Sequence, residues 1–153
     1  MKLFSTLHFR FICLVLSLIA TISSCKKEDP EPPLAEQIAG EYNGTYYLLG
    51  PSTKINLPAT TSTGITATLK ITVSKISDEI VNIQVKLTLT DKTGKASDSF
   101  SKYDGLLLKK AANGDIEGYE GTTKRSTFIN GELSVGFPDP DPTKTVIFYG
   151  KKN

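Results

Sequence analysis

Two stretches of this chain place an apolar side chain at every second position. The apolar residues are Ile65, Ala67, Leu69, Ile71 and Val73 in the first stretch, and Val81, Ile83, Val85, Leu87 and Leu89 in the second. Because side chains of a β-strand point alternately to the two faces of a sheet, this period predicts two long, half-buried strands. Ser77-Asp78-Glu79 lies between them and predicts a tight turn, so we expect an antiparallel hairpin.

Six more strands are expected along the rest of the chain. Their ranges are 42–49, 97–103, 106–110, 116–120, 125–137 and 146–151. The 97–103 stretch is polar and is expected to be an edge or weak strand, and Asp104-Gly105 after it is expected to be a turn. The prolines in 138–142 cannot donate ladder hydrogen bonds and predict a loop. Helix signals are nearly absent; only 33–40 is expected to form one or two helical turns, ended by Gly40.

About eight strands joined in sequence order by short turns predict an all-β chain. Such a meander buries its apolar faces by closing into an antiparallel up-and-down barrel or, alternatively, by folding into a two-layer β-sandwich. Short sequential connections favour the barrel, whose interior at eight strands holds packed side chains or one small ligand. The residues expected to line it are Leu69, Ile71, Val73, Ile83, Val85, Leu87, Leu133 and Val135. These residues would line an apolar ligand site or form a filled core, which is the commoner arrangement of aliphatic strand faces.

Residues 1–24 have the layout of a secretory signal peptide. Lys2 and Arg10 form the positive flank, and the apolar run of 12 residues at 11–22 follows. A spanning helix needs about 20 such residues, so this run is too short for a stable transmembrane anchor. The small residues Ser23 and Ser24 then lead into Cys25.

The sequence Ile22-Ser23-Ser24-Cys25 resembles the lipobox of bacterial lipoproteins, in which an aliphatic and two small residues precede a cysteine. The resemblance implies cleavage before Cys25, a diacylglyceryl group on its sulfur and a fatty acid such as palmitate on its new amine. Several acyl chains, at ~0.8 kcal/mol per buried CH₂, would hold the protein on a membrane. The alternative is an ordinary signal peptide followed by a chance cysteine.

Residues 25–37 are predicted to be a lipidated flexible tether, followed by the barrel domain at 38–153. Charge and proline in Lys26–Pro33 keep such a segment extended. Lys26-Lys27-Glu28-Asp29 resembles the tract after the cysteine in surface lipoproteins of Bacteroidetes. That resemblance implies the outer membrane of the cell envelope, on its periplasmic or its external side. A solvated spacer without an address is the equal alternative.

Removal of the leader would also remove most of the side chains that carry catalytic chemistry. His8 is the single histidine, Cys13 leaves with the leader, and Cys25 would be used by the lipid. A Ser-His-acid triad, a cysteine nucleophile, a disulfide and a zinc or copper site built on His or Cys are then excluded. Acid–base chemistry by Asp, Glu, Lys or Tyr is the alternative that remains; we expect no enzyme, no catalytic residues and no cofactor.

Two groups of oxygen-bearing side chains are the remaining metal candidates. They are Asp139, Asp141 and Thr143, and Asp115, Glu117 and Glu120. Neither group has the spacing of a calcium-binding loop, so we expect solvated turn carboxylates and no metal site. Without Lys2 and Arg10, the 18 basic residues become 16 and equal the 16 acidic ones, so no nucleic-acid partner is expected.

The start of the predicted barrel resembles a known family. Gly40-Glu41-Tyr42 is similar to the Gly-x-Trp opening of lipocalins and other calycins, with Tyr in place of Trp, and 39–45 matches the start of small calycin-like lipoproteins of Bacteroidetes. The resemblance implies a calycin-like barrel, a long loop at 50–64 over its mouth, and Lys151 or Lys152 packed over Tyr42. It also implies a non-enzymatic protein that binds a small apolar or amphipathic ligand. The alternative is a structural or interaction lipoprotein with a filled barrel, accessory to a cell-envelope complex.

Overall fold

The computed structural model of this chain describes residues 30–153. The predicted signal peptide at 1–24, the lipobox residues Ile22, Ser23 and Ser24, and Cys25 lie outside the described residues. Pro32–Asn153 forms one compact unit. Within the described part, no helix is both long enough and apolar enough to cross a bilayer.

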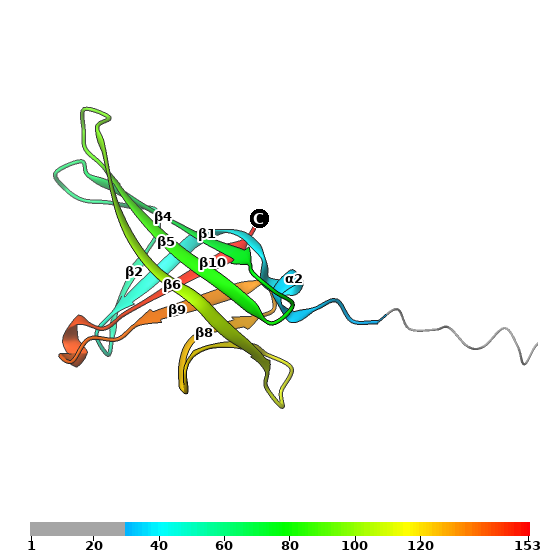
Figure 1. Cartoon of the computed structure of the whole chain (residues 1–153). Coiled ribbons are helices and arrows are strands. Elements are labelled where there is room, and N and C mark those ends of the chain that lie inside the picture. Colours follow the sequence, from blue (N-terminus) through cyan, green and yellow to red (C-terminus); the bar gives the residue numbers. More distant parts are fainter. Residues whose placement is uncertain (1–29) are drawn as a thin grey trace, which may run out of the picture. The chain divides into compact units, whose positions relative to one another are not determined.

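The unit is a closed antiparallel barrel of eight strands with two short additional strands (Figure 1). Its elements are α2 (Leu34–Ile38), β1 (Gly40–Leu49), β2 (Thr53–Asn56), β3 (Ala59–Thr60), β4 (Thr66–Lys75), β5 (Ile80–Thr90), β6 (Ala96–Lys110), β7 (Ile116–Glu120), β8 (Thr123–Ile129), β9 (Glu132–Phe137), a 3₁₀ turn (Pro142–Lys144) and β10 (Val146–Lys152). Strands β4 to β10 pair in sequence order, and β1 pairs with both β10 and β4. The up-and-down barrel prediction is therefore confirmed, and the sandwich alternative is wrong.

Strand β1 closes the ring with its first half only. Glu41 and Asn43 lie opposite Thr72 and Lys70 of β4, but beyond this point β1 turns away and pairs with β2. The two strands are closest at Gly44, where an added Cβ would overlap the side chain of Leu69. A glycine is required there because any side chain would push β1 off β4.

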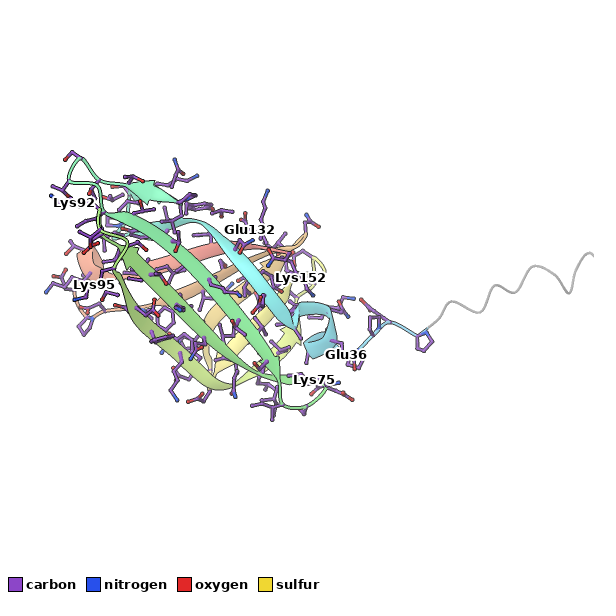
Figure 2. All side chains as sticks on the ribbon, turned by 90° about the horizontal axis from the view of Figure 1, so that it is seen from above. Glu36, Lys75, Lys92, Lys95, Glu132 and Lys152 are labelled. Carbon is purple, nitrogen blue, oxygen red and sulfur yellow. The ribbon has the colours of Figure 1, made fainter. Side chains whose placement is uncertain are left out.

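The two ends of the barrel differ. The closed end holds α2, whose Ala35 and Ile38 are fully buried, and its backbone N–H of Ala35 donates to Asp78 O at 3.0 Å in the β4–β5 turn. Figure 2 shows Glu36, Lys75 and Lys152 at this end, and Lys92 and Lys95 of the β5–β6 turn at the other. Toward that open end, β4, β5 and β6 diverge from β1, β9 and β10 (Figure 1).

The predicted helical turn at 33–40 is confirmed as α2. Four of its five residues, 34–37, fall in the range assigned to the tether, yet Ala35 belongs to the buried core together with Ile38. The side chains that plug the closed end of the barrel therefore begin ahead of residue 38.

The expected turn at Asp104-Gly105 is wrong, because β6 runs through it as one strand of 15 residues. Opposite β5, the pairing passes from Ile83↔Tyr103 to Val81↔Leu106, so Asp104-Gly105 is a β-bulge. Gly105 has φ +71°, and its N–H donates to the Asn82 side chain at 2.9 Å. The glycine that suggested a turn thus supplies the positive φ of a bulge, which bends a continuous strand.

The single strand expected over 125–137 is also wrong. Asn130 and Gly131 both have positive φ, 49° and 83°, and form a two-residue turn between β8 and β9. Such a turn suits the right-handed twist of paired strands. The sequence interpretation missed it because Ile129, Gly131 and Leu133 continue the two-residue period across the turn.

The long open loop expected at 50–64 is partly wrong. The segment contains β2, which extends β1, and β3, which pairs with the start of β4 at Ala59↔Ala67. It spans the position where β1 and β4 have separated, and Leu57 packs against the core from this segment. It therefore completes the wall at the open end and is not a loose cover.

Candidate functional site

The closed half of the barrel is filled with side chains. Seven of the eight residues expected to line the interior are buried, and Leu87 is half-buried. Around them pack Tyr42, Val81, Leu106 and Leu108, while Ile38 seals the end. In this half the filled-core alternative is the correct one, so a ligand would need space toward the open end.

An aromatic layer, made of Tyr103, Phe137, Phe148 and Tyr47, crosses the barrel above this core. Tyr103 and Phe137 stack with ring centroids 4.8 Å apart, Phe137 meets Phe148 edge-on at 5.9 Å, and Phe148 meets Tyr47 at 5.9 Å. The Tyr103 hydroxyl donates to Gly136 O at 2.7 Å. Because β6, β9, β10 and β1 each contribute one ring, the layer forms the floor of the open half.

Arg125 lies at one end of the aromatic layer. Its guanidinium carbon is 5.6 Å from the centroid of the Tyr103 ring, and its Nη2 lies 2.9 Å from Glu120 Oε2. Burial raises the pKa of Tyr103, and the nearby Arg125 charge opposes that rise. The site therefore has one half-buried cation beside its floor, held by an exposed carboxylate.

The mouth is the set of inward-facing side chains above the aromatic layer: Leu49, Leu87, Leu89, Val146, Ser97, Ser99 and Ser101. The strand register fixes their direction, because residues directly opposite in a pair point to the same face. Leu49 lies opposite Val146, next to the inward pair Tyr47 and Phe148, and Leu89 follows Val85 and Leu87 on β5. Leu49 and Leu89 remain 39% and 41% exposed although they face into the barrel.

One wall of the mouth is lined by hydroxyl groups, here called the serine stripe. Ser101, Ser99 and Ser97 of β6 lie opposite Val85, Leu87 and Leu89 of β5, so they face the same side. Within the described residues, none of the three hydroxyls takes part in a hydrogen bond. An apolar wall thus stands beside a row of donors and acceptors that are free to bond to something else.

A cleft of about 190 Å³ opens where β1 leaves β4. It is lined by Asn43, Gly44, Leu57, Pro58, Thr68 and Leu69. Pockets for drug-sized ligands usually measure about 300–1,000 Å³, so this cleft alone holds only a small group. Its inner side reaches Leu69 and therefore adjoins the upper edge of the core.

Lys152 does lie at the closed end, but its ammonium group is directed to the helix. Its Nζ donates to Gln37 O at 2.9 Å, at the end of α2, and its stem passes Gly40. Lys152 is also the direct cross-strand partner of Tyr42. The Tyr42 ring meets Phe128 edge-on at 6.2 Å, and its hydroxyl donates to Ile38 O at 2.5 Å. Burial raises the pKa of Tyr42.

The two groups of oxygen ligands are used locally. Asp141 Oδ1 accepts from the Thr143 N–H at 3.0 Å and from its hydroxyl at 2.7 Å. Glu117 Oε1 pairs with Lys124 Nζ at 2.8 Å, and Glu120 pairs with Arg125. Among residues 30–153, no group of three or more His, Cys, Asp and Glu side chains is placed to hold a metal ion.

The sequence interpretation missed several residues of this site. The aromatic layer depends on Phe137 and Phe148, whose spacing in the chain gives no sign that they meet. The serine stripe did leave a signal, because Ser97, Ser99 and Ser101 alternate with the same period as the leucines that they face. The sequence interpretation used it only to predict an edge or weak strand.

No protein-family model and no curated protein matches the sequence. Among solved structures, a de novo designed fluorescence-activating β-barrel is similar to this chain. The two share 9% sequence identity, the match covers 79% of this chain and 98% of the designed one, and the TM-score is 0.35. The fold assignment therefore rests on the strand pairing described above.

Proposed function

We propose that this chain is a lipid-anchored, non-catalytic protein of the bacterial cell envelope whose mouth binds a small amphipathic ligand. The observation that carries the ligand proposal is the exposure of Leu49 and Leu89 inside a barrel that is tightly filled elsewhere. Apolar side chains that face an interior are normally covered, because leaving them in water costs about 25 cal/mol per Å².

The serine stripe favours an amphipathic ligand over a pure hydrocarbon. A purely apolar guest would leave the hydroxyls of Ser97, Ser99 and Ser101 without partners wherever it displaced their water, which is unfavourable. A guest with a polar edge and an apolar face would satisfy both walls at once. Its apolar end would lie on the aromatic layer, and the small cleft beside Leu69 would take one group.

The ligand proposal can be tested with N-phenyl-1-naphthylamine, a dye that fluoresces in apolar surroundings. The chain would carry Cys25→Ser so that no detergent competes for the dye. We expect saturable fluorescence, reduced several-fold by Leu89→Asn and unchanged by Leu107→Asn. Leu107 is the matched control, because it is the same residue with similar exposure, 38%, on the outer face of β6. Absence of saturable binding, or equal effects of the two substitutions, would contradict the proposal.

The anchoring proposal rests on the lipobox at 22–25, where an aliphatic and two small residues precede Cys25. The diacylglyceryl group would be attached to the Cys25 sulfur. The proposed site of attachment is the outer membrane.

Membrane fractionation of cells that produce the full chain tests the anchor. Cys25→Ser is expected to release the protein from the membrane fraction, because no sulfur remains for the diacylglyceryl group. Cys13→Ser, within the predicted signal peptide, is the control and should leave the protein in that fraction. Retention of the Cys25→Ser variant would show that the anchor is assigned wrongly.

A second candidate function is an interaction protein with a filled barrel. The filled closed half and the exposure of Phe100 on the outer face of β6 favour it. A dye result that excludes ligand binding would leave this candidate as the better one.

A further inference from the structure

Strand β6 has a long unpaired edge. On one side it pairs with β5 from Ala96 to Leu107, but on the other it pairs with β7 only from Leu107 to Lys110. Among the described residues, no strand pairs with the second side of 96–106. The edge of a sheet presents backbone N–H and C=O groups that can add another strand. Residues 96–106 of β6 therefore offer a template for strand addition.

The outer face of this edge carries the most exposed of the large apolar side chains. Phe100 is 58% exposed, and Lys86 Nζ of β5 lies 5.9 Å from its ring centroid. Asp98 and Lys102 lie two residues before and two residues after Phe100, on the same face. A negative charge, an aromatic ring and a positive charge thus follow one another along the edge.

This order is complementary to itself when two copies run antiparallel. With a two-fold axis at Phe100, the two rings lie opposite each other, and Asp98 of each copy lies opposite Lys102 of the other. Opposite charges and aromatic pairs across strands are favourable. On the inner face, Ser99 lies opposite Ser101 of the second copy.

Neighbouring registers lack this match. An axis at Ser101 would place Asp98 opposite Asp104 of the second copy, and an axis at Ser99 would place Phe100 opposite Asp98. Like charges directly opposite each other are unfavourable, and an unmatched charge beside an aromatic ring gains little. The arrangement of charges therefore selects one register.

The charges needed for the match are available in the single chain. Lys102 Nζ pairs with Asp104 Oδ2 at 2.7 Å, but both side chains are more than 60% exposed. Exposed pairs of this kind contribute little and exchange readily. Asp98 is bonded to Lys86 at 2.8 Å and to the Thr88 hydroxyl at 2.7 Å, which orients its carboxylate on the outer face and leaves it able to accept from a further donor.

We propose that a second copy of this chain pairs antiparallel with the free edge of β6, with the two-fold axis at Phe100. The two sheets then become continuous, and the serine stripes of the two mouths adjoin. One strand pair buries less surface than a permanent interface, so the dimer is expected to be weak and concentration-dependent. The proposal does not depend on ligand binding, because it rests on the outer face and the edge.

Cross-linking of the full chain tests the register. In Phe100→Cys, the two cysteines lie directly opposite, about 4.5–5.5 Å apart at Cα, which a disulfide can span. Mild oxidation followed by trypsin should give the 96–102 peptide linked to a second copy of itself. In the control Asp98→Cys, the two cysteines are four residues out of register, roughly 13 Å apart along the strand, and should not link. Equal yields from the two variants, or no link in either, would overturn the proposal.

Charge exchange gives an independent test by sedimentation of the full chain. Asp98→Lys places two lysine pairs opposite each other and should weaken dimerisation about tenfold. Asp98→Lys combined with Lys102→Asp restores opposite charges and should restore the dimer, although the contact between residue 98 and Lys86 stays lost. A double variant as weak as the single one, or a native chain that is monomeric at all concentrations, would overturn the proposal.

Discussion

The closed and open halves of the barrel are built from the same strands and differ in what those strands direct inward. In the closed half, β6 contributes Leu106 and Leu108, which are buried. Beyond the bulge at Asp104-Gly105, the same strand contributes Tyr103 and then the serine stripe. Along β6 the alternation continues, but beyond Tyr103 its inward side chains are serines, whereas β1 and β5 still direct Leu49 and Leu89 inward. The strand pairing that forms the barrel wall is therefore specified independently of the apolar side chains that fill the interior. In the mouth the wall is present, but the interior is not filled.

The largest expected contrast is in the free energy of unfolding that is lost when a buried leucine or a leucine of the mouth is truncated to alanine. Leu133→Ala, at a fully buried position of the closed half, is expected to lower the free energy of unfolding by about 2–5 kcal/mol through lost burial and a cavity. Leu89→Ala, at the mouth, is expected to cost less than about 1 kcal/mol. Urea unfolding of the two variants measures both values. Similar losses would mean that the open half is packed as tightly as the closed half.

A smaller contrast in stability is expected when two glycines within strands are replaced by alanine. At Gly44, where β1 meets β4, a methyl group would overlap Leu69, so Gly44→Ala is expected to cost about 1–3 kcal/mol. At Gly136, near the mouth, the nearest atoms would be 3.8 Å away, so Gly136→Ala is expected to be neutral or slightly stabilising. The midpoint of thermal unfolding distinguishes them. If Gly44→Ala is harmless, the close approach of β1 and β4 is not needed for closure.

The smallest effect on stability is expected from lowering the pH, and it is expected at the open end of the barrel. Hydrogen bonds from Thr93 lower the pKa of Asp91 in the β5–β6 turn, and those from Thr143 lower the pKa of Asp141 in the β9–β10 loop. A carboxyl group whose pKa is lower in the folded state stabilises the fold above its ordinary pKa. That contribution is lost as the pH falls through the folded value.

Amide exchange, corrected for its intrinsic pH dependence, should therefore show these two segments opening as the pH falls below about 4. The amides of Ile71 and Leu133 in the apolar core should be less affected. In Asp141→Asn, the side-chain oxygen can still accept from Thr143 but no longer titrates. The pH response of the β9–β10 loop should then disappear, and its persistence would assign the response to another group.

The sequence predicted the parts of the fold that follow from local periodicity. The hairpin of β4 and β5 follows from alternation, closure into a ring follows from short connections in sequence order, and the helical turn at α2 follows from the helix signals at 33–40. The expected number of eight strands is also the observed one, because the expected strand at 125–137 is two strands and the expected strands at 97–103 and 106–110 are one. The polar 97–103 stretch was expected to be an edge or weak strand, and its unpaired side confirms the edge.

The errors arose where a local signal has two structural uses. A glycine with positive φ serves equally in a turn and in a bulge, and Gly105 is in a bulge. Ile129 points outward on β8. Counted in steps of two, however, it falls into line with the inward-facing residues of β9, such as Leu133, so the Asn130-Gly131 turn was not recognised.

The candidate site was less predictable than the fold. The contacts of the aromatic layer and the position of Arg125 over Tyr103 depend on strand register across the ring, which a linear pattern does not contain. The cleft beside Leu69 depends on where β1 leaves β4, and that point is set by a steric contact between distant residues.

The pairing of β1 with β10 has a consequence for the time at which the fold can form. The Thr45 hydroxyl donates to Tyr149 O across 104 residues of sequence, so the first strand of the ring waits for the last one to be made. Contacts between segments that are distant in the sequence slow folding, because the chain loses the entropy of closing a long loop before such a contact forms. A nascent copy therefore holds no finished barrel until β10 has been synthesised, because the ring lacks the strand that joins β1 to β9.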